Sequence, residues 1–166
     1  MLGIGSNVFI FISFVVLGFI IHELGHIFGL YLTYSKYTGF YFNSNEFAAV
    51  VKGKTYNIQS KVFVIILGSL SSIVLFMLVK LVLIHKKYAY MHLALNTVIL
   101  NEILYWSYSA FIDYGDASSF LDIIIFDKIL FGSFFLMLYV ILFLFSMREF
   151  TMQIQEHYLK YIEILT

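Results

Sequence analysis

The sequence has no cysteine and no proline among its 166 residues, and only 12% of the residues are charged. Without cysteine, disulfide bonds and thiolate ligands are excluded, so a bound metal would need His, Asp, Glu or water. Without proline, any break in a helix depends on glycine or on polar side chains. Ten basic residues balance ten acidic ones, and this absence of a charge excess argues against a nucleic-acid partner.

The chain is rich in apolar residues instead of charged ones. Hydrophobic residues make up 61% of the sequence and aromatic residues 20%, and the mean hydropathy is +0.92. A soluble domain has about twice this fraction of charged residues. Four apolar runs have the length needed to cross a lipid bilayer: residues 8–32, 62–84, 88–112 and 129–147. We therefore expect an all-α, multi-pass integral membrane protein, with residues 1–147 forming one helical domain.

Two further segments have patterns of their own. In the polar interval between the first two runs, apolar residues 40–42 and 47–51 flank Asn43-Ser44-Asn45, which predicts a small β-hairpin. Such a hairpin would either dip its aromatic side chains into the headgroups or pair its edge with an extended peptide. In residues 148–166, apolar side chains recur at steps of three and four, which predicts a C-terminal amphipathic helix at the membrane surface.

The strongest chemical signal is His22-Glu23-Leu24-Gly25-His26, inside the first apolar run. On a helix, His22 and His26 lie on the same face, so both imidazoles can bind one zinc ion. Glu23, beside the first histidine, can then act as the general base that takes a proton from water. Ionisable groups in a membrane span are costly and usually mark function. The alternative is a pair of neutral histidines that form hydrogen bonds inside a helix bundle.

A catalytic zinc ion normally has three protein ligands. The third apolar run is parallel to the first, so a third ligand at the depth of the histidines should lie in its second half or just after it. Glu102 has the right depth if this run is one straight helix at 1.5 Å per residue, whereas Asp113 or Asp116 fits if the chain folds back. Glu102 could instead orient a histidine N–H. The neighbouring Asn101 could bind a substrate oxyanion or make a packing hydrogen bond between helices.

These segments resemble the site-2 protease family of intramembrane zinc metalloproteases. The similarity covers roughly residues 8–120: the H-E-L-G-H sequence, the hairpin interval, and the small-residue patch Gly68–Ser72 in the second run. In that family an Asn in the third span precedes the Asp that is the third ligand, and Asn101 followed by Gly115-Asp116 is similar to this arrangement.

The resemblance implies a zinc site made of His22, His26 and Asp116, with Glu23 as the catalytic residue. It also implies that the protein hydrolyses a peptide bond in or near a transmembrane segment of a membrane-protein or peptide substrate. The competing hypothesis is a metal-binding membrane protein without protease activity, either a metal transporter or an inactive scaffold. Glu23 favours the enzyme, because metal binding alone does not require it, and no inverted repeat supports transport.

Overall fold

The computed structural model describes residues 4–43, 48–83 and 89–165. Within these ranges the chain is mostly helical, with five helices and one two-stranded antiparallel sheet. The helical class and the hairpin agree with the sequence prediction, but the set of helices differs from it. The elements, in chain order, are α1 (Ile4–Leu32), β1 (Lys36–Asn43), β2 (Ala48–Lys54), α2 (Ile58–Leu83), α3 (Ala89–Phe111), α4 (Asp116–Ile124) and α5 (Lys128–Leu165).

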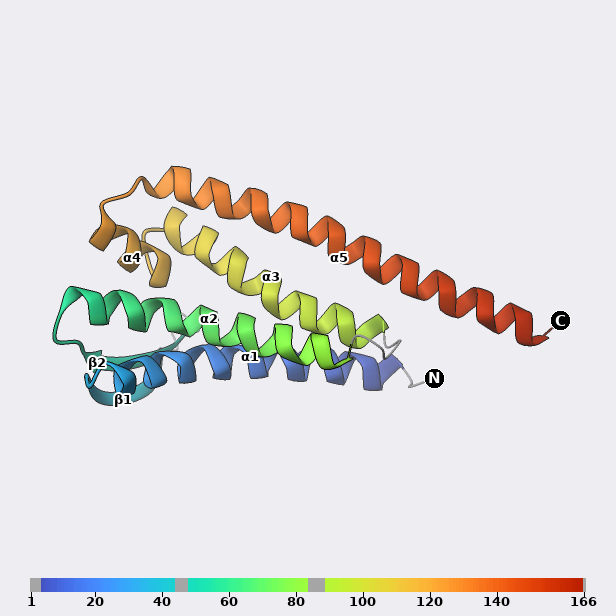
Figure 1. Ribbon diagram of the computed structural model, residues 1–166, viewed down its shortest axis with the longest axis horizontal. Coiled ribbons are helices and arrows are strands. Elements are labelled where there is room, and N and C mark those ends of the chain that lie inside the picture. Colours follow the sequence, from blue (N-terminus) through green and yellow to red (C-terminus); the bar gives the residue numbers. More distant parts are fainter. Residues whose placement is uncertain (1–3, 44–47, 84–88, 166) are drawn as a thin grey trace.

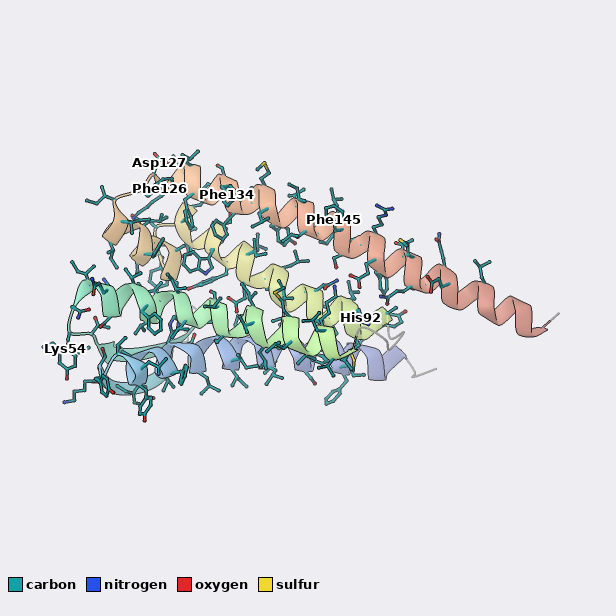
Figure 2. The ribbon with its side chains drawn as sticks, in the orientation of Figure 1. Lys54, His92, Phe126, Asp127, Phe134 and Phe145 are labelled. Atoms are coloured by element: carbon teal, nitrogen blue, oxygen red, sulfur yellow. The ribbon has the colours of Figure 1, made fainter. Side chains whose placement is uncertain are left out.

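The long helices form a bundle that Figure 1 shows from the side. α1 and α2 lie side by side and antiparallel, α3 runs in the direction of α1, and α5 packs along α3 and extends beyond the other helices. Figure 2 marks the two ends of the bundle: Lys54 and Phe126 lie at one end, and His92 lies toward the other.

Three helices in the described ranges, rather than the four expected, are long and apolar enough to cross a membrane: Val8–Leu32 of α1, Ile58–Leu83, and Lys128–Glu156 of α5. The expected span at residues 88–112 does form a helix, α3, but this helix is less apolar. Twelve of its 23 residues are buried, including the polar Asn96, Glu102 and Ser107. Because α3 contacts α1, α2 and α5, its surroundings are largely protein, and protein neighbours can satisfy polar groups that lipid cannot.

The expected C-terminal amphipathic helix, residues 148–166, is not a separate element. α5 runs for 38 residues from Lys128 to Leu165 without a break at residue 147. No glycine or proline follows Gly132 in the sequence, so nothing in the backbone interrupts the helix there.

α1 and α2 approach closely through small residues. The hydroxyl of Ser71 donates to the carbonyl oxygen of Ile21 at 3.0 Å, and that of Ser72 donates to the carbonyl oxygen of Gly18 at 3.1 Å. A Cβ atom at Gly25 would overlap the carbonyl oxygen of Leu67. The small-residue patch of the second apolar run therefore serves as the contact surface for α1.

The hairpin is present and longer than the apolar runs predict. Its register pairs Lys36 with Lys54, Phe40 with Val51 and Asn43 with Ala48, with an irregularity between Tyr37 and Gly39. The expected turn lies largely in residues 44–47, outside the described residues. The sheet lies beside the C-terminal end of α1 (Figure 1).

Candidate metal centre

His22 and His26 lie one turn apart on the face of α1 that is turned into the bundle. Their rings are edge to face, with centroids 4.9 Å apart, and the two Nε2 atoms are 3.2 Å apart. His22 is only 7% exposed. Gly68 of α2 lies directly under the ring of His26, because a Cβ atom there would overlap that imidazole. The close contact between α1 and α2 thus holds the second histidine in place.

Asp116 reaches the same point from the other side of the bundle. α3 ends at Phe111, and the chain turns back through Asp113 and Gly115, which have φ angles of 58° and 91°. Asp116 is the first residue of α4, and its Oδ2 atom is 3.1 Å from Nε2 of both His22 and His26. Of the two geometries that the sequence left open, the chain adopts the one that folds back.

The Nδ1 atom of each imidazole, on the side of the ring away from Asp116, also has a hydrogen-bond partner. Nδ1 of His22 lies 3.0 Å and 3.2 Å from the two carboxylate oxygens of Glu102, which is 7% exposed on α3. Nδ1 of His26 lies 2.9 Å from the carbonyl oxygen of Val64 on α2. A carbonyl oxygen and an ionised carboxylate can only accept, so both Nδ1 atoms carry the proton and donate it.

With both protons on Nδ1, the neutral rings have an unprotonated lone pair on each Nε2 atom. In this neutral form, the two lone pairs and the Asp116 carboxylate oxygen converge as three acceptors, whereas doubly protonated rings would donate from Nε2 to Asp116. A cation satisfies three converging acceptors at once. In metal sites, a ligating histidine commonly donates its second N–H to a carboxylate or a backbone carbonyl, which is the arrangement of His22 and His26.

The size of the site agrees with a transition-metal ion. The three donor atoms form a triangle with edges of 3.1, 3.1 and 3.2 Å. A tetrahedral zinc site with ligands at about 2.0 Å has ligand-to-ligand distances of about 3.3 Å. The residues present therefore fit zinc in both donor chemistry and spacing.

Glu23 lies beside this triangle on α1. It is partly buried, and one of its carboxylate oxygens is within 4.8 Å of a ring nitrogen of each histidine. Glu23, His22 and His26 are a group that can hold a metal ion. Asp116 contacts both rings at 3.1 Å, so the histidines have a carboxylate on each side.

Two other candidates from the sequence lie apart from the histidines. Asp113 is exposed, accepts hydrogen bonds from Lys128 and from the Ser118 hydroxyl, and does not contact the histidines. The hydrogen bond from Lys128 holds the pKa of the Asp113 carboxyl below its ordinary value. Asn101 is exposed on α3, and among the described residues its side chain makes no hydrogen bond to another helix.

Sequence reasoning missed Tyr105, which lies three residues after Glu102 and therefore on the same side of α3. Its ring meets that of His22 edge to face at 5.5 Å, and its hydroxyl accepts the backbone N–H of Asp116 at 3.2 Å. The hydroxyl of Ser109 accepts the next N–H, that of Ala117, at 3.1 Å. Two side chains of α3 thus hold the N-terminus of α4, and with it Asp116.

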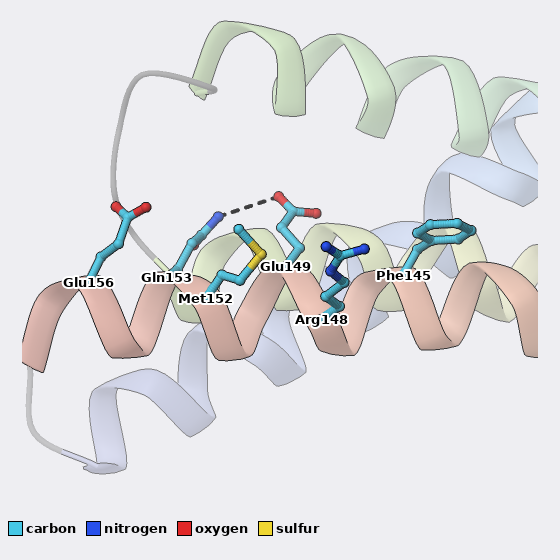
Figure 3. Close-up of a pocket in the computed structure, with 6 residues that line it drawn as sticks. All are labelled: Phe145, Arg148, Glu149, Met152, Gln153 and Glu156. Carbon is cyan, nitrogen blue, oxygen red and sulfur yellow. Dashed lines mark hydrogen bonds between the residues drawn. The ribbon is translucent and has the colours of Figure 1, made fainter.

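An open groove of about 550 Å³ lies far from this site, along the C-terminal half of α5. Figure 3 shows its lining and the hydrogen bond between Gln153 and Glu149. Glu149 also pairs with Lys80, which is 12 residues beyond Gly68 in α2 and hence about 18 Å along the helix from the metal centre. The groove is therefore no part of the candidate site.

No protein-family model matches the chain, and no curated protein or solved structure is significantly similar to it. The functional argument accordingly depends on the geometry of the site.

Proposed function

We propose that the protein is an intramembrane zinc metalloprotease, which hydrolyses a peptide bond in or near a transmembrane segment of a membrane-protein substrate. In this proposal α1, α2 and α5 cross the bilayer, and α3 crosses with them as the innermost span. The H-E-L-G-H sequence then lies at membrane depth, as in the site-2 protease family that this segment resembles.

The observation that carries the proposal is the convergence of three acceptors. Nε2 of His22, Nε2 of His26 and Oδ2 of Asp116 lie within 3.2 Å of one another. Both rings are oriented from behind by Glu102 and by the Val64 carbonyl. Burying such polar groups inside an apolar bundle costs free energy. Binding of a cation would offset that free energy.

The ligand atoms limit which metal ions the site can bind, and Glu23 limits which type of reaction the site can catalyse. Two imidazoles and a carboxylate suit zinc and also iron(II). A carboxylate directly after the first histidine favours hydrolysis, because it supplies the base that activates water. We therefore choose zinc and peptide hydrolysis.

When bound, zinc would supply Lewis acidity that polarises the scissile carbonyl and lowers the pKa of water. Glu23 then accepts a proton from the attacking water and delivers it to the amine nitrogen as the C–N bond breaks. Glu102 keeps the His22 ring in the tautomer whose Nε2 lone pair faces the site. Val64 does the same for His26 through its backbone carbonyl.

The test is Glu23→Gln in the full chain, reconstituted with zinc in liposomes together with a fluorogenic transmembrane peptide. We expect the zinc content to stay at one per chain and the cleavage rate to fall by about 10²-fold or more, since only the base is lost. Glu156→Gln, on the distant part of α5, is the matched control and should cleave at the wild-type rate. Undiminished cleavage by Glu23→Gln would refute the role of this residue. Zinc flux into the liposomes without any cleavage would favour a transporter.

A further inference from the structure

Tyr105 has a second hydrogen-bonding function that the fold does not use. Its hydroxyl oxygen accepts the N–H of Asp116, and this leaves the hydroxyl hydrogen to be donated elsewhere. Among the described residues, no side chain or carbonyl accepts that hydrogen. The residue is 36% exposed, so a molecule bound at the site could reach it.

The hydroxyl is held close to the three donor atoms. Asp116 connects the two directly, since its backbone N–H binds the hydroxyl and its carboxylate contacts both histidines. The edge-to-face contact with His22 fixes the ring from the side. A rigid O–H next to a candidate metal centre is suited to bind an oxygen atom of a substrate.

Gly115 makes this placement possible. Its φ angle is 91°, a conformation that residues with a side chain rarely adopt, and a Cβ atom there would lie 2.8 Å from the Tyr105 hydroxyl oxygen. The same Cβ atom would lie 2.9 Å from the Ser109 hydroxyl oxygen. The chain therefore turns through a glycine where the backbone must pass next to the tyrosine hydroxyl.

We propose that Tyr105 is a catalytic residue whose hydroxyl donates a hydrogen bond to the oxygen of the scissile carbonyl. This inference depends on the proposed protease function and assigns the oxyanion donor that the sequence suggested at Asn101. Asn101 is four residues earlier on α3, and no hydrogen bond joins it to the histidines or to Asp116, whereas Tyr105 contacts both His22 and Asp116.

In the hydrolytic step, the oxygen of water forms a bond to the carbonyl carbon, and the carbonyl π electrons move onto the carbonyl oxygen. Tyr105 stabilises this negative charge through its O–H and keeps its proton. The proton released by water goes to Glu23 and then to the leaving nitrogen as the C–N bond breaks. The products are a carboxylic acid and an amine, so no other reactant is needed.

The competing role for Tyr105 is structural, because its hydroxyl also satisfies the first N–H of α4. Two inhibitors separate the roles: a phosphinic peptide, whose charged tetrahedral oxygen resembles the developing oxyanion, and a thiol peptide, which binds metal through sulfur. The test compares wild type, Tyr105→Phe and the matched control Tyr108→Phe, an exposed residue one turn further along α3. Zinc content, kcat, KM and both inhibition constants are measured on the full chain.

We expect Tyr105→Phe to keep one zinc per chain, to lower kcat by about 10²–10³-fold and to leave KM within about twofold, as for other lost oxyanion donors. Affinity for the phosphinic peptide should fall by about 10- to 100-fold while the thiol peptide binds as before, and Tyr108→Phe should match wild type. An unchanged kcat, or a parallel loss of zinc and of both inhibitors, would overturn the inference. If wild type binds zinc but cleaves nothing, the protease proposal fails, and the inhibitor pair still shows whether Tyr105 binds an oxyanion.

Discussion

Two groups of polar side chains lie between the helices of this bundle, and they differ in how their hydrogen bonds are balanced. At one end, Lys80 of α2 donates to Asn96 of α3 and to Glu149 of α5, both at 2.8 Å. Asn96 in turn donates to the Ser146 hydroxyl at 2.9 Å. In this Lys80 network, Lys80 and Asn96 both donate to acceptors, and the positive charge is next to a negative one. A structural role, the connection of three helices, is therefore enough to explain this network.

At the other end, the candidate metal centre has more acceptors than donors when both histidine rings are neutral. His22 and His26 each donate one N–H, to Glu102 and to the Val64 carbonyl, and these two hydrogen bonds use all the protons that neutral rings carry. The Asp116 carboxylate and both Nε2 atoms still face one another. Burial alone does not separate the two groups, because both contain buried polar residues. The balance of donors and acceptors does when the rings are neutral, and it is the basis for proposing a cation at this site.

The strongest test of this difference between the two polar groups is to remove one carboxylate from each of them. Asp116→Asn replaces a charged ligand with a neutral amide, and we expect the zinc affinity to fall by at least about 100-fold. Glu149→Gln removes the same charge from the Lys80 network and should leave zinc affinity unchanged. Competition with a chromophoric chelator measures both. Equal zinc affinity in Asp116→Asn and wild type would mean that Asp116 is not the third ligand.

A finer test concerns the residue behind the ring. Glu102→Gln keeps the shape of the side chain but weakens the hydrogen bond to Nδ1 of His22, so zinc affinity should fall by about 10-fold. The neighbouring Asn101→Ala is the control, because Asn101 is exposed and should not affect the metal. A fall as large as that of Asp116→Asn would instead indicate that Glu102 is itself a ligand.

The sequence predicts those parts of the site whose residues are close together along the chain, and it does not predict contacts between distant segments. His22, Glu23 and His26 follow from spacing within one helix, and the pattern alone indicates their chemistry. Asp116 came from a family resemblance, because its position depends on a turn through Asp113 and Gly115 that no periodicity announces. The Val64 contact could not be predicted at all, since it uses a backbone carbonyl, which every residue has.

The fold shows the same dependence. α1, α2 and α5 follow from long apolar runs, whereas α4 has only nine residues and looks like a weakly apolar link. Its apolar residues Ala117 and Leu121 are nonetheless fully buried with Trp106 and Ile65. A helix this short depends on tertiary packing, which a window of sequence does not show.

The Lys80 network makes its own prediction, which concerns stability rather than metal. Lys80→Met removes the cation beside Glu149 and the donor to the Asn96 side-chain oxygen. We expect the free energy of unfolding to fall by about 1–2 kcal/mol, less than for a fully buried pair because both charged side chains are about one-third exposed. The double variant Lys80→Met with Glu149→Leu should recover most of this loss. Denaturant unfolding in detergent micelles measures all three, and zinc affinity should not change. A double variant no more stable than Lys80→Met would show that the pair is not the source of the effect.

The smallest effect is expected from a third polar group, which is balanced like the Lys80 network but lies at the surface. Asp113, whose side chain is 68% exposed, pairs with Lys128, and this hydrogen bond lowers the pKa of the carboxyl. A lowered pKa means that the stabilisation is present above the unfolded pKa of about 3.9 and is lost as the pH falls through the folded pKa.

Asp113→Asn is a mild change because asparagine tolerates the φ of 58°. Its melting temperature should therefore be slightly below wild type at pH 7, and the difference should shrink as the pH falls from about 4 toward the folded pKa of Asp113. High salt should also reduce the difference, because exposed ion pairs are weaker at high ionic strength, while the Lys80 pair should keep more of its effect. A salt-independent difference would mean that Asp113 acts through the turn rather than through its charge.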